Sequence, residues 1–442
     1  MLGEYRIEGR RAAEIAASVE RAVGAGELEP GQLLPPMREL AGELGVNPNT
    51  VASAYRILRE RGVIETDGRR GSRVRSKPAT TGREYARMDV PEGVRNVASG
   101  NPDPALLPSL AKAFTEAAEQ ADREPVLYGD ALVEPELARV ARAELDADGV
   151  PDGPLTVASG SLDAIERVLA AHLKPGDTVA VEDPGWGSLL DLIPALGLRT
   201  APVRVDDEGP LPDDVRRALE SGARALIVTD RAQNPTGAAV TAARARALRA
   251  VLRDHPEILL IEDDHGHGIV DLPLYPLAGP TRHWAFVRSV AKAYGPDLRL
   301  AVLTGDPVTV DRVTGRHRLG PGWLSRITQR AVVGLWTDGA HDTRAVAAAY
   351  RTRRDRLIDA LARRGVEAHG RSGLNVWIPV PDETAAVSRL LHAGWAVAPG
   401  ARFRMNAPAG IRVTVSTLGL EEIDSLADAV ADTFRRPWAS SV

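Results

Sequence analysis

Residues 34–62 read LPPMRELAGELGVNPNTVASAYRILRERG, and this stretch holds two helix signals on either side of a turn. Proline suits the first turn of a helix, so Pro36 predicts the start of one helix, which ends at Gly45. Asn47 is a favourable N-cap and Pro48 a favourable first residue for the helix that follows. The stretch therefore predicts two helices joined by a tight turn.

The flanking residues add a helix before this pair and a hairpin after it. Residues 10–25 place apolar side chains at helical spacing. Residues 63–76 (VIETDGRRGSRVRS) predict two short strands around a turn at Asp67-Gly68, and the segment 69–77 has five basic side chains and no acidic one. Three helices followed by a basic hairpin outline a winged helix-turn-helix, whose second paired helix enters the major groove of DNA.

DNA contacts are expected from the start of the second paired helix and from basic residues around it. Asparagine can bond adenine through two hydrogen bonds, and threonine can bond a base or a phosphate. Arginine side chains can contact phosphates or the minor groove. A small helical cap with a solvated basic turn is the alternative, but it does not account for the ordered set of features. The candidate DNA-contacting residues are Arg38, Asn47, Asn49, Thr50, Tyr55, Arg69, Arg70 and Arg73.

The same segment resembles a known DNA-binding family. From Leu28 to Val74 it is similar to the GntR-type DNA-binding domain, with the LPPMRELA box, the VNPNTV turn, the AYRILRERG helix and the glycine-containing wing in order. The resemblance implies a DNA-binding domain over residues 1–77. Residues 78–95 are polar and marked by proline, which predicts a connector to the rest of the chain.

Residues 96–442 alternate short apolar strands with helical stretches. Alternation of this kind predicts an α/β domain, a mostly parallel sheet covered by helices. Ligands of such sheets bind at the carboxyl ends of the strands. The expected strands are 155–159, 178–183, 225–230, 258–263, 284–290 and 298–305.

Polar motifs follow two of these strands. Ser159-Gly160-Ser161 opens a helix, where exposed amides and the helix dipole favour a phosphate group; an ordinary capped helix is the alternative. The motif NPTG at 234–237 either directs the amide of Asn234 toward a ligand oxygen or forms an ordinary Asn-Pro turn.

Acidic residues and a lysine follow the next two strands. In residues 263–267 (DDHGH) a carboxylate could keep a pyridine nitrogen protonated; a metal site and a solvated loop are alternatives, and no further ligand cluster supports a metal. Lys292 is one of four lysines among 55 basic residues and follows an apolar strand, where a lowered pKa would suit an imine-forming nucleophile. A solvated surface lysine is the alternative.

In their order these motifs resemble the fold type I pyridoxal-phosphate enzymes, the aspartate aminotransferase superfamily, over residues 96–435. The resemblance implies pyridoxal 5'-phosphate as the cofactor and a small C-terminal α+β subdomain over roughly 340–442. It implies that Lys292 forms the internal aldimine, that Asp263 pairs with the pyridine nitrogen and that Arg412 binds a carboxylate. The other implied contacts are Asn234 at the phenolic oxygen, Trp186 on the ring, Ser159, Gly160, Ser161, Ser289 and Arg299 at the phosphate, and Tyr128 at the phosphate of a neighbouring subunit.

One position departs from the family pattern. Relatives carry a tyrosine shortly after the aspartate, bonding the cofactor oxygen, and His265 stands there in this chain. An imidazole could donate the same bond, although its charge would vary near neutral pH. The departure weighs more against efficient transamination than against cofactor binding. Trp186 could also be plain core, Tyr128 a buried aromatic and Arg412 a surface strand residue.

The two halves together resemble the MocR subfamily of GntR regulators. That resemblance implies a homodimer whose cofactor-dependent binding to repeated DNA half-sites responds to an amino compound through an external aldimine. An active aminotransferase with an accessory DNA-binding domain is the main alternative, and the motifs leave its turnover open. A binding protein that has lost its cofactor is a third, which the intact Lys292 and Asp263 argue against.

Composition excludes several other classes. The 442 residues suit two or three domains, and the absence of any run of about 18 apolar residues predicts no membrane span. The charged N-terminus lacks the apolar centre of a signal peptide. The absence of cysteine excludes disulfides and thiolate metal sites and fits a cytoplasmic protein without a metal centre. The net charge of −5 does not by itself indicate a DNA-binding protein.

Overall fold

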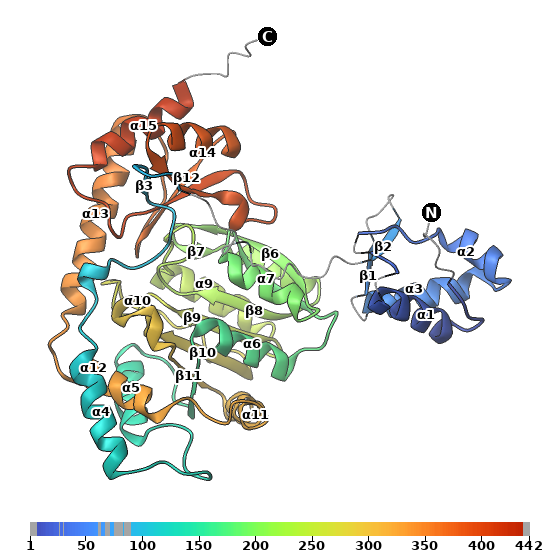
Figure 1. Ribbon diagram of the computed structural model, residues 1–442, viewed down its shortest axis with the longest axis horizontal. Helices are drawn as coiled ribbons and strands as arrows, with labels where there is room; N and C mark the ends of the chain where they lie inside the picture. Colours follow the sequence, from blue (N-terminus) through green and yellow to red (C-terminus); the bar gives the residue numbers. More distant parts are fainter. Residues whose placement is uncertain are drawn as a thin grey trace. The chain divides into compact units, whose positions relative to one another are not determined.

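The structure is a computed structural model that describes residues 7–25, 27–29, 31–60, 63–66, 71–74, 83 and 90–435. The chain separates into two compact units (Figure 1). One unit contains Met1–Ala86 with two short later segments, and the other contains most of the remaining chain. None of the helices in the described part of the chain combines the length and the apolar character that a transmembrane span needs.

The N-terminal part forms a small head, defined here as the described residues between 7 and 74. Its helices are α1 (Ala12–Ala25), α2 (Met37–Leu44) and α3 (Pro48–Glu60), and its strands β1 (Ile64–Thr66) and β2 (Ser72–Val74) pair antiparallel. Apolar side chains from all three helices and both strands share one core, which includes Ile15, Val19, Leu40, Val51, Leu58, Ile64 and Val74.

This architecture confirms the predicted winged helix-turn-helix. α2 ends at Gly45, and the Asn47 side chain accepts a hydrogen bond from the backbone N–H of Asn49 at 2.9 Å, so it caps α3 as expected. The predicted turn at Asp67-Gly68 lies outside the described residues.

An eight-stranded sheet organises the second unit, with the strand order β4-β11-β10-β9-β8-β5-β6-β7. The central strands β8 (Ala223–Thr229), β9 (Leu259–Asp264) and β10 (His283–Ser289) run parallel to one another. The strand β11 (Ala301–Gly305) runs antiparallel to both of its neighbours, β10 and β4 (Leu155–Ala158). The remaining strands are β5 (Thr178–Asp183), β6 (Arg199–Asp206) and β7 (Gly209–Pro210).

The sheet confirms the predicted α/β class and adds two details. The strands β6 and β7 were not expected, because the exposed and half-buried residues of β6 give it no apolar run. The sheet was expected to be mostly parallel, and the direction of β11 was not predicted. Only the short helices α10 (Ala291–Tyr294) and η3 (Pro296–Leu298) join it to β10, and a parallel neighbour needs a longer crossover.

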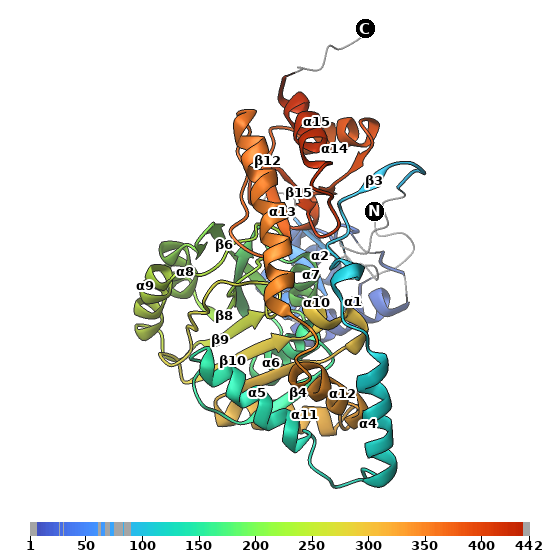
Figure 2. The ribbon, with the colours of Figure 1, turned by 90° about the vertical axis from the view of Figure 1, so that its left-hand side faces the viewer.

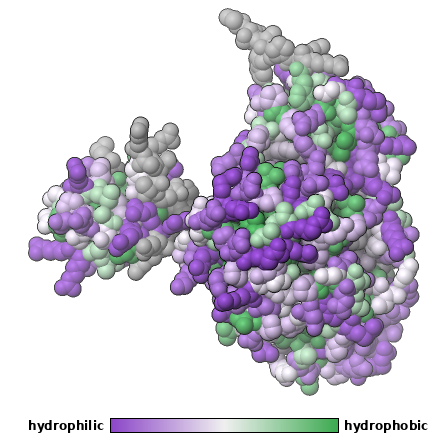
Figure 3. Space-filling view, turned by 180° about the vertical axis from the view of Figure 1, so that it is seen from behind, coloured by the Kyte–Doolittle hydropathy of each residue, from purple (hydrophilic) through white to green (hydrophobic). Residues whose placement is uncertain are grey.

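Helices surround this sheet (Figure 1). The visible face of the unit in Figure 3 is largely hydrophilic with scattered apolar residues, as expected when the apolar side chains are buried between helices and sheet. The helices are η2 (Pro104–Leu106), α4 (Ala111–Arg123), α5 (Pro135–Ala147), α6 (Ser161–His172), α7 (Gly187–Ala195), α8 (Pro212–Glu220), α9 (Ala242–Arg253), α11 (Pro307–Arg318) and α12 (Arg326–Thr337).

The C-terminal residues build a second, smaller core. A three-stranded sheet in the order β12-β15-β14 is covered by helices, and the long helix α13 (Thr343–Arg363) runs from the α12 end of the unit into this subdomain (Figure 2). Its elements are β3 (Arg95–Asn96), β12 (Asn375–Pro379), α14 (Glu383–His392), β13 (Trp395–Ala396), β14 (Ala398–Pro399), η4 (Gly400–Arg402), β15 (Gly410–Thr414) and α15 (Ile423–Arg435).

Candidate functional site

The start of α3 presents polar side chains on the surface of the head. Asn49 is exposed, Thr50 is partly exposed, and Arg38 is exposed on α2. Asn47 is exposed as well, although its side-chain oxygen already caps α3. Amide and hydroxyl groups at this position have the chemistry that reads base edges in the major groove. Contacts from these residues to DNA remain predictions.

Tyr55 does not belong to this surface. Its side chain is 1% exposed, and its hydroxyl donates a hydrogen bond to the carbonyl of Pro35 at 2.8 Å. It lies four residues after Val51 and three before Leu58, so it falls on the buried stripe of α3. The predicted DNA contact of Tyr55 is therefore wrong. Arg73 is half-buried in β2, and Arg69 and Arg70 lie outside the described residues.

The turn from β4 into α6 forms a cradle suited to a phosphate group. Gly160 has a φ of +93°, and a Cβ atom there would lie 2.7 Å from Nη2 of Arg299. That same nitrogen donates to the carbonyl oxygen of Ser159 at 2.6 Å. The Oγ atom of Ser161 is buried and has no hydrogen-bond partner within the described residues. An arginine, an unpartnered hydroxyl and the N-terminus of a twelve-residue helix thus converge.

Ser289 ends β10, ten residues before Arg299 in the sequence. Its Oγ accepts a hydrogen bond from the N–H of Ala291 at 3.2 Å, which supports the start of α10. Lys292 lies in α10, and its Nζ donates to the carbonyl of Gly100 at 2.7 Å. Ser289 is thus the last residue of a buried strand, and Lys292 lies in the short helix that follows it.

The two acidic residues at the end of β9 have different environments. Asp264 is fully buried between Arg231 and Arg288, at 2.8 and 3.0 Å, and these charges hold its pKa well below its ordinary value although burial opposes them. Asp263 bonds His265 through Oδ2, while its buried Oδ1 has no partner in the described chain. Only Asp263 therefore has an oxygen left for a ligand.

His265 also differs from the prediction. Its Nδ1 lies 2.8 Å from Oδ2 of Asp263 and its Nε2 lies 2.8 Å from the carbonyl oxygen of Ala232. Both ring nitrogens are engaged by the protein, so in this structure His265 is not placed as a donor to a cofactor oxygen. The ring centre of Trp186 lies 6.4 Å from that of His265.

Asn234 and Arg412 approach each other from distant parts of the chain. Nη1 of Arg412 donates to Oδ1 of Asn234 at 2.8 Å, and Nη2 donates to the carbonyl of Ala98 at 2.6 Å. The guanidinium lies 4.5 Å from the ring centre of Phe403, and Arg412 is 4% exposed. Arg412 is therefore not a surface residue. Sequence reasoning missed the contacts of Ala98, Gly100 and Phe403.

Tyr128, the predicted contact to a neighbouring subunit, lies on the surface. Its side chain is 92% exposed and packs edge-on against Trp323, with ring centres 5.4 Å apart. It is not a buried aromatic, and its exposure is compatible with a contact to a second subunit.

A cluster of Asp148, Asp264 and His267 has donor atoms close enough to hold a metal ion. Arg231 and Arg288 already pair with these carboxylates. Burial, followed by the charge of Arg288, lowers the pKa of His267 to about 3. We interpret the cluster as a buried ion-pair network beneath the sheet edge, with its cations supplied by arginine.

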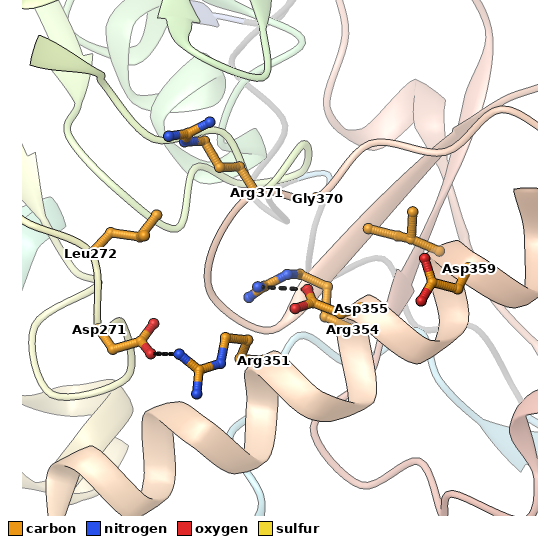
Figure 4. Close-up of a pocket in the computed structure, with 9 residues that line it drawn as sticks. Asp271, Leu272, Arg351, Arg354, Asp355, Asp359, Gly370 and Arg371 are labelled. Carbon is orange, nitrogen blue, oxygen red and sulfur yellow. Dashed lines mark hydrogen bonds and ion pairs between the residues drawn. The ribbon is translucent and has the colours of Figure 1, made fainter.

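A cleft of about 450 Å³ lies beside α13 (Figure 4). Figure 4 shows Arg351 paired with Asp271 and Arg354 paired with Asp355, so the charges that line the cleft largely offset one another. None of the predicted cofactor contacts lies in it.

The residues grouped at the strand ends suit a phosphorylated pyridine cofactor. The cradle matches a phosphate, the unpartnered Oδ1 of Asp263 matches a ring N–H, and Lys292 supplies an amine. Together, the head and this pocket define a DNA-binding protein with a cofactor domain of the aminotransferase type.

Comparison with known proteins identifies the family. Residues 92–430 match the family described as aminotransferase class I and II, and residues 11–74 match the bacterial regulatory proteins of the gntR family. The chain is 40% identical, over 97% of its length and 100% of the relative, to the vitamin B6 salvage pathway transcriptional repressor PtsJ of Salmonella typhimurium. It is 28% identical to the HTH-type pyridoxine biosynthesis transcriptional regulator PdxR of Corynebacterium glutamicum, over 79% of this chain and 78% of the relative.

Among solved structures, aspartate aminotransferase from Thermus thermophilus with maleate matches with a TM-score of 0.67 and 25% identity, over 77% of this chain and 91% of that chain. This protein belongs to the class I and II aminotransferase family and carries a gntR-family head, the layout of the MocR regulators. The predicted recognition, fold class and pyridoxal-phosphate-dependent regulatory function are confirmed. The exact domain boundaries remain predictions.

Proposed function

We propose that this regulator controls genes of vitamin B6 metabolism and that occupancy of its cofactor pocket sets its affinity for operator DNA. The unpartnered, buried Oδ1 of Asp263 carries the proposal, because a buried carboxylate oxygen without a partner is costly unless a ligand completes it. Two relatives named for vitamin B6 salvage and pyridoxine biosynthesis support the choice of genes. Because its target is chromosomal DNA, we place its action in the bacterial cytoplasm.

Each residue of the pocket has a proposed task. When bound, pyridoxal phosphate supplies an aldehyde that an amine can attack and a ring that withdraws electrons. Lys292 would hold the cofactor at its aldehyde, and Oδ1 of Asp263 would accept a hydrogen bond from the ring nitrogen. Ser161 and Arg299, with Ser159, Gly160 and Ser289, surround the phosphate. Asn234 faces the phenolic oxygen and Trp186 covers the ring.

The buried guanidinium of Arg412 favours a second candidate signal, an amino compound with a carboxylate. Arg412 is held in place by Asn234, Ala98 and Phe403, so its fork is oriented before a ligand arrives. An amine on the same compound would compete with Lys292 for the cofactor carbon and would free the lysine. Cofactor and amino compound could then act at one pocket with opposite effects on DNA binding.

We further propose a homodimer that binds repeated half-sites. Tyr128 is 92% exposed, its chain neighbour Leu127 is 68% exposed, and Leu319 is 91% exposed. Large exposed side chains of this kind are expected where a partner subunit covers them. A twofold dimer would present its two heads to a repeated operator whose spacing follows the dimer.

The test is the affinity of the full-length protein for its own upstream DNA, measured by fluorescence anisotropy with pyridoxal phosphate, pyridoxine or single amino acids added. We expect pyridoxal phosphate to change Kd at least tenfold, which corresponds to about 1.4 kcal/mol of coupling. Pyridoxine lacks both the phosphate and the aldehyde and serves as the control. If amino acids alone change Kd, the second candidate replaces the first, and equal Kd under all conditions refutes both.

An active aminotransferase remains the alternative function. Sustained conversion of an amino donor with a keto acid by the purified protein would favour it. A single half-reaction without turnover would favour the regulator.

A further inference from the structure

His265 lies between two hydrogen-bond acceptors. Oδ2 of Asp263 is on one side and the carbonyl oxygen of Ala232 on the other, each at 2.8 Å from a ring nitrogen. The side chain is 14% exposed, so water does not replace either contact. A carbonyl oxygen cannot donate a hydrogen, and an ionised carboxylate cannot either.

This geometry indicates how many N–H groups the imidazole ring of His265 carries. A neutral imidazole has one N–H and could satisfy one of the two acceptors, whereas an imidazolium has two and satisfies both. Opposing effects act on the pKa of His265. Burial lowers this pKa, and the charge of Lys292 also lowers it, but less strongly. The charge and hydrogen bond of Asp263 outweigh them and raise that pKa above its ordinary value. Glu182, buried on β5, also interacts with Asp263.

The contact to Ala232 connects the pair to the C-terminal subdomain. The N–H of Ala232 donates to Oγ of Ser372 at 2.8 Å, and that Oγ donates in turn to the carbonyl of Gly237 at 3.0 Å. Ser372 is 1% exposed and directly precedes the strand region of that subdomain. A continuous chain of hydrogen bonds therefore runs from Asp263 through His265 and Ala232 to Ser372.

We propose that His265 is a positioning residue that remains protonated, fixes Asp263 so that only Oδ1 faces the ligand, and ties this carboxylate to the C-terminal subdomain through Ala232 and Ser372. The imidazolium offsets the charge of Asp263, so the pair can accept a hydrogen bond from a ring nitrogen while stabilising a positive ring less than a lone carboxylate would. The pocket is thus built to hold a pyridine ring more than to activate it. The ligand identity rests on the proposed function, whereas the protonation state does not.

The first test needs no ligand. In protein with ¹⁵N-labelled histidine, the ring of His265, assigned with His265→Gln, is expected to carry two N–H groups at pH 7 and to titrate above about 6.5, the ordinary histidine value. Asp263→Asn should lower its pKa below that value, because the asparagine supplies no charge. His392, which is exposed, is the matched control and should not respond to Asp263→Asn.

The second test asks whether the clamp on His265, meaning its two hydrogen bonds to Asp263 and Ala232, positions the carboxylate of Asp263. The affinity for pyridoxal phosphate, measured by fluorescence quenching against pH, should change slope at the measured pKa of His265 in the wild type and not in His265→Gln. A purely structural role would alter thermal stability but leave no such break. A singly protonated His265 at pH 7, or the same pH profile in both proteins, would overturn the proposal, even if pyridoxal phosphate were still bound.

Discussion

The head and the cofactor domain present their candidate contacts in opposite ways. On the head, Asn49 and Arg38 are exposed and project from a small apolar core that they do not support. In the large domain, Asp263, Asp264 and Arg412 are at least 96% buried and held by other polar groups. Substitution of these exposed head residues should therefore change DNA binding alone, whereas substitution in the pocket should change stability and binding together.

The largest effect is expected where the burial is deepest. Asp264→Ala leaves Arg231 and Arg288 without their shared carboxylate, and breaking a buried pair of this kind costs about 3–5 kcal/mol. Urea denaturation of the wild type and the variant measures the change in the free energy of unfolding. The adjacent Asp263→Ala is the matched control and should cost less stability while weakening cofactor binding more. Equal losses of stability in the two variants would contradict the different environments of Asp263 and Asp264.

Asn49→Ala should separate binding from folding on the head. If Asn49 reads a base, the change costs about 1–3 kcal/mol at one operator position. The free energy of unfolding should stay unchanged, because the side chain is exposed. Binding to a set of single-base operator variants measures this directly. An equal loss on every sequence would mean that Asn49 contacts only the DNA backbone.

Tyr55→Phe should instead lower the stability of the head and leave its operator affinity unchanged. Removing the hydroxyl leaves the Pro35 carbonyl without its donor, which costs about 1 kcal/mol of stability. Operator affinity at a temperature where both proteins are folded should be equal to that of the wild type. A loss of operator affinity without loss of stability would return Tyr55 to the DNA surface.

The smallest effect is expected for Arg38→Ala. A phosphate contact at the protein surface contributes to affinity mainly through released counterions, so the slope of log K against log salt should fall by about 0.9. Glu39→Ala, on the same helix and also exposed, is the matched control and should not reduce the slope. An unchanged slope for Arg38→Ala would remove it from the interface.

Much of the fold was predictable because local signals agree with it. The caps around α3, the parallel strands β8 to β10 and the motifs at their ends all lie where the pattern placed them. Antiparallel β11 was not predictable from residue types, because a buried apolar run looks alike in either direction. In β6 the apolar residues Ala201, Val203 and Val205 alternate, but the strand is mostly exposed or half-buried and contains no apolar run.

The sequence indicated candidate site residues, but it could not indicate the contacts between them. The pleat of β9 sends Asp263 and Asp264 to opposite faces, which distinguishes them only once the partners Arg231 and Arg288 are in place. The clamp on His265 depends on Ala232, 33 residues away in sequence, and Tyr55 was misplaced because a tyrosine suits both a core and a surface.

The central claim, that the cofactor pocket governs the DNA-binding head, is tested most directly by the operator affinity of Lys292→Ala. Kd would be measured with and without saturating pyridoxal phosphate, beside the visible absorption of the same samples. We expect the wild type to show an absorption band that depends on Lys292 and a Kd that depends on pyridoxal phosphate, and the variant to lose both. A variant that loses the band but keeps the full cofactor effect on Kd would contradict the claim.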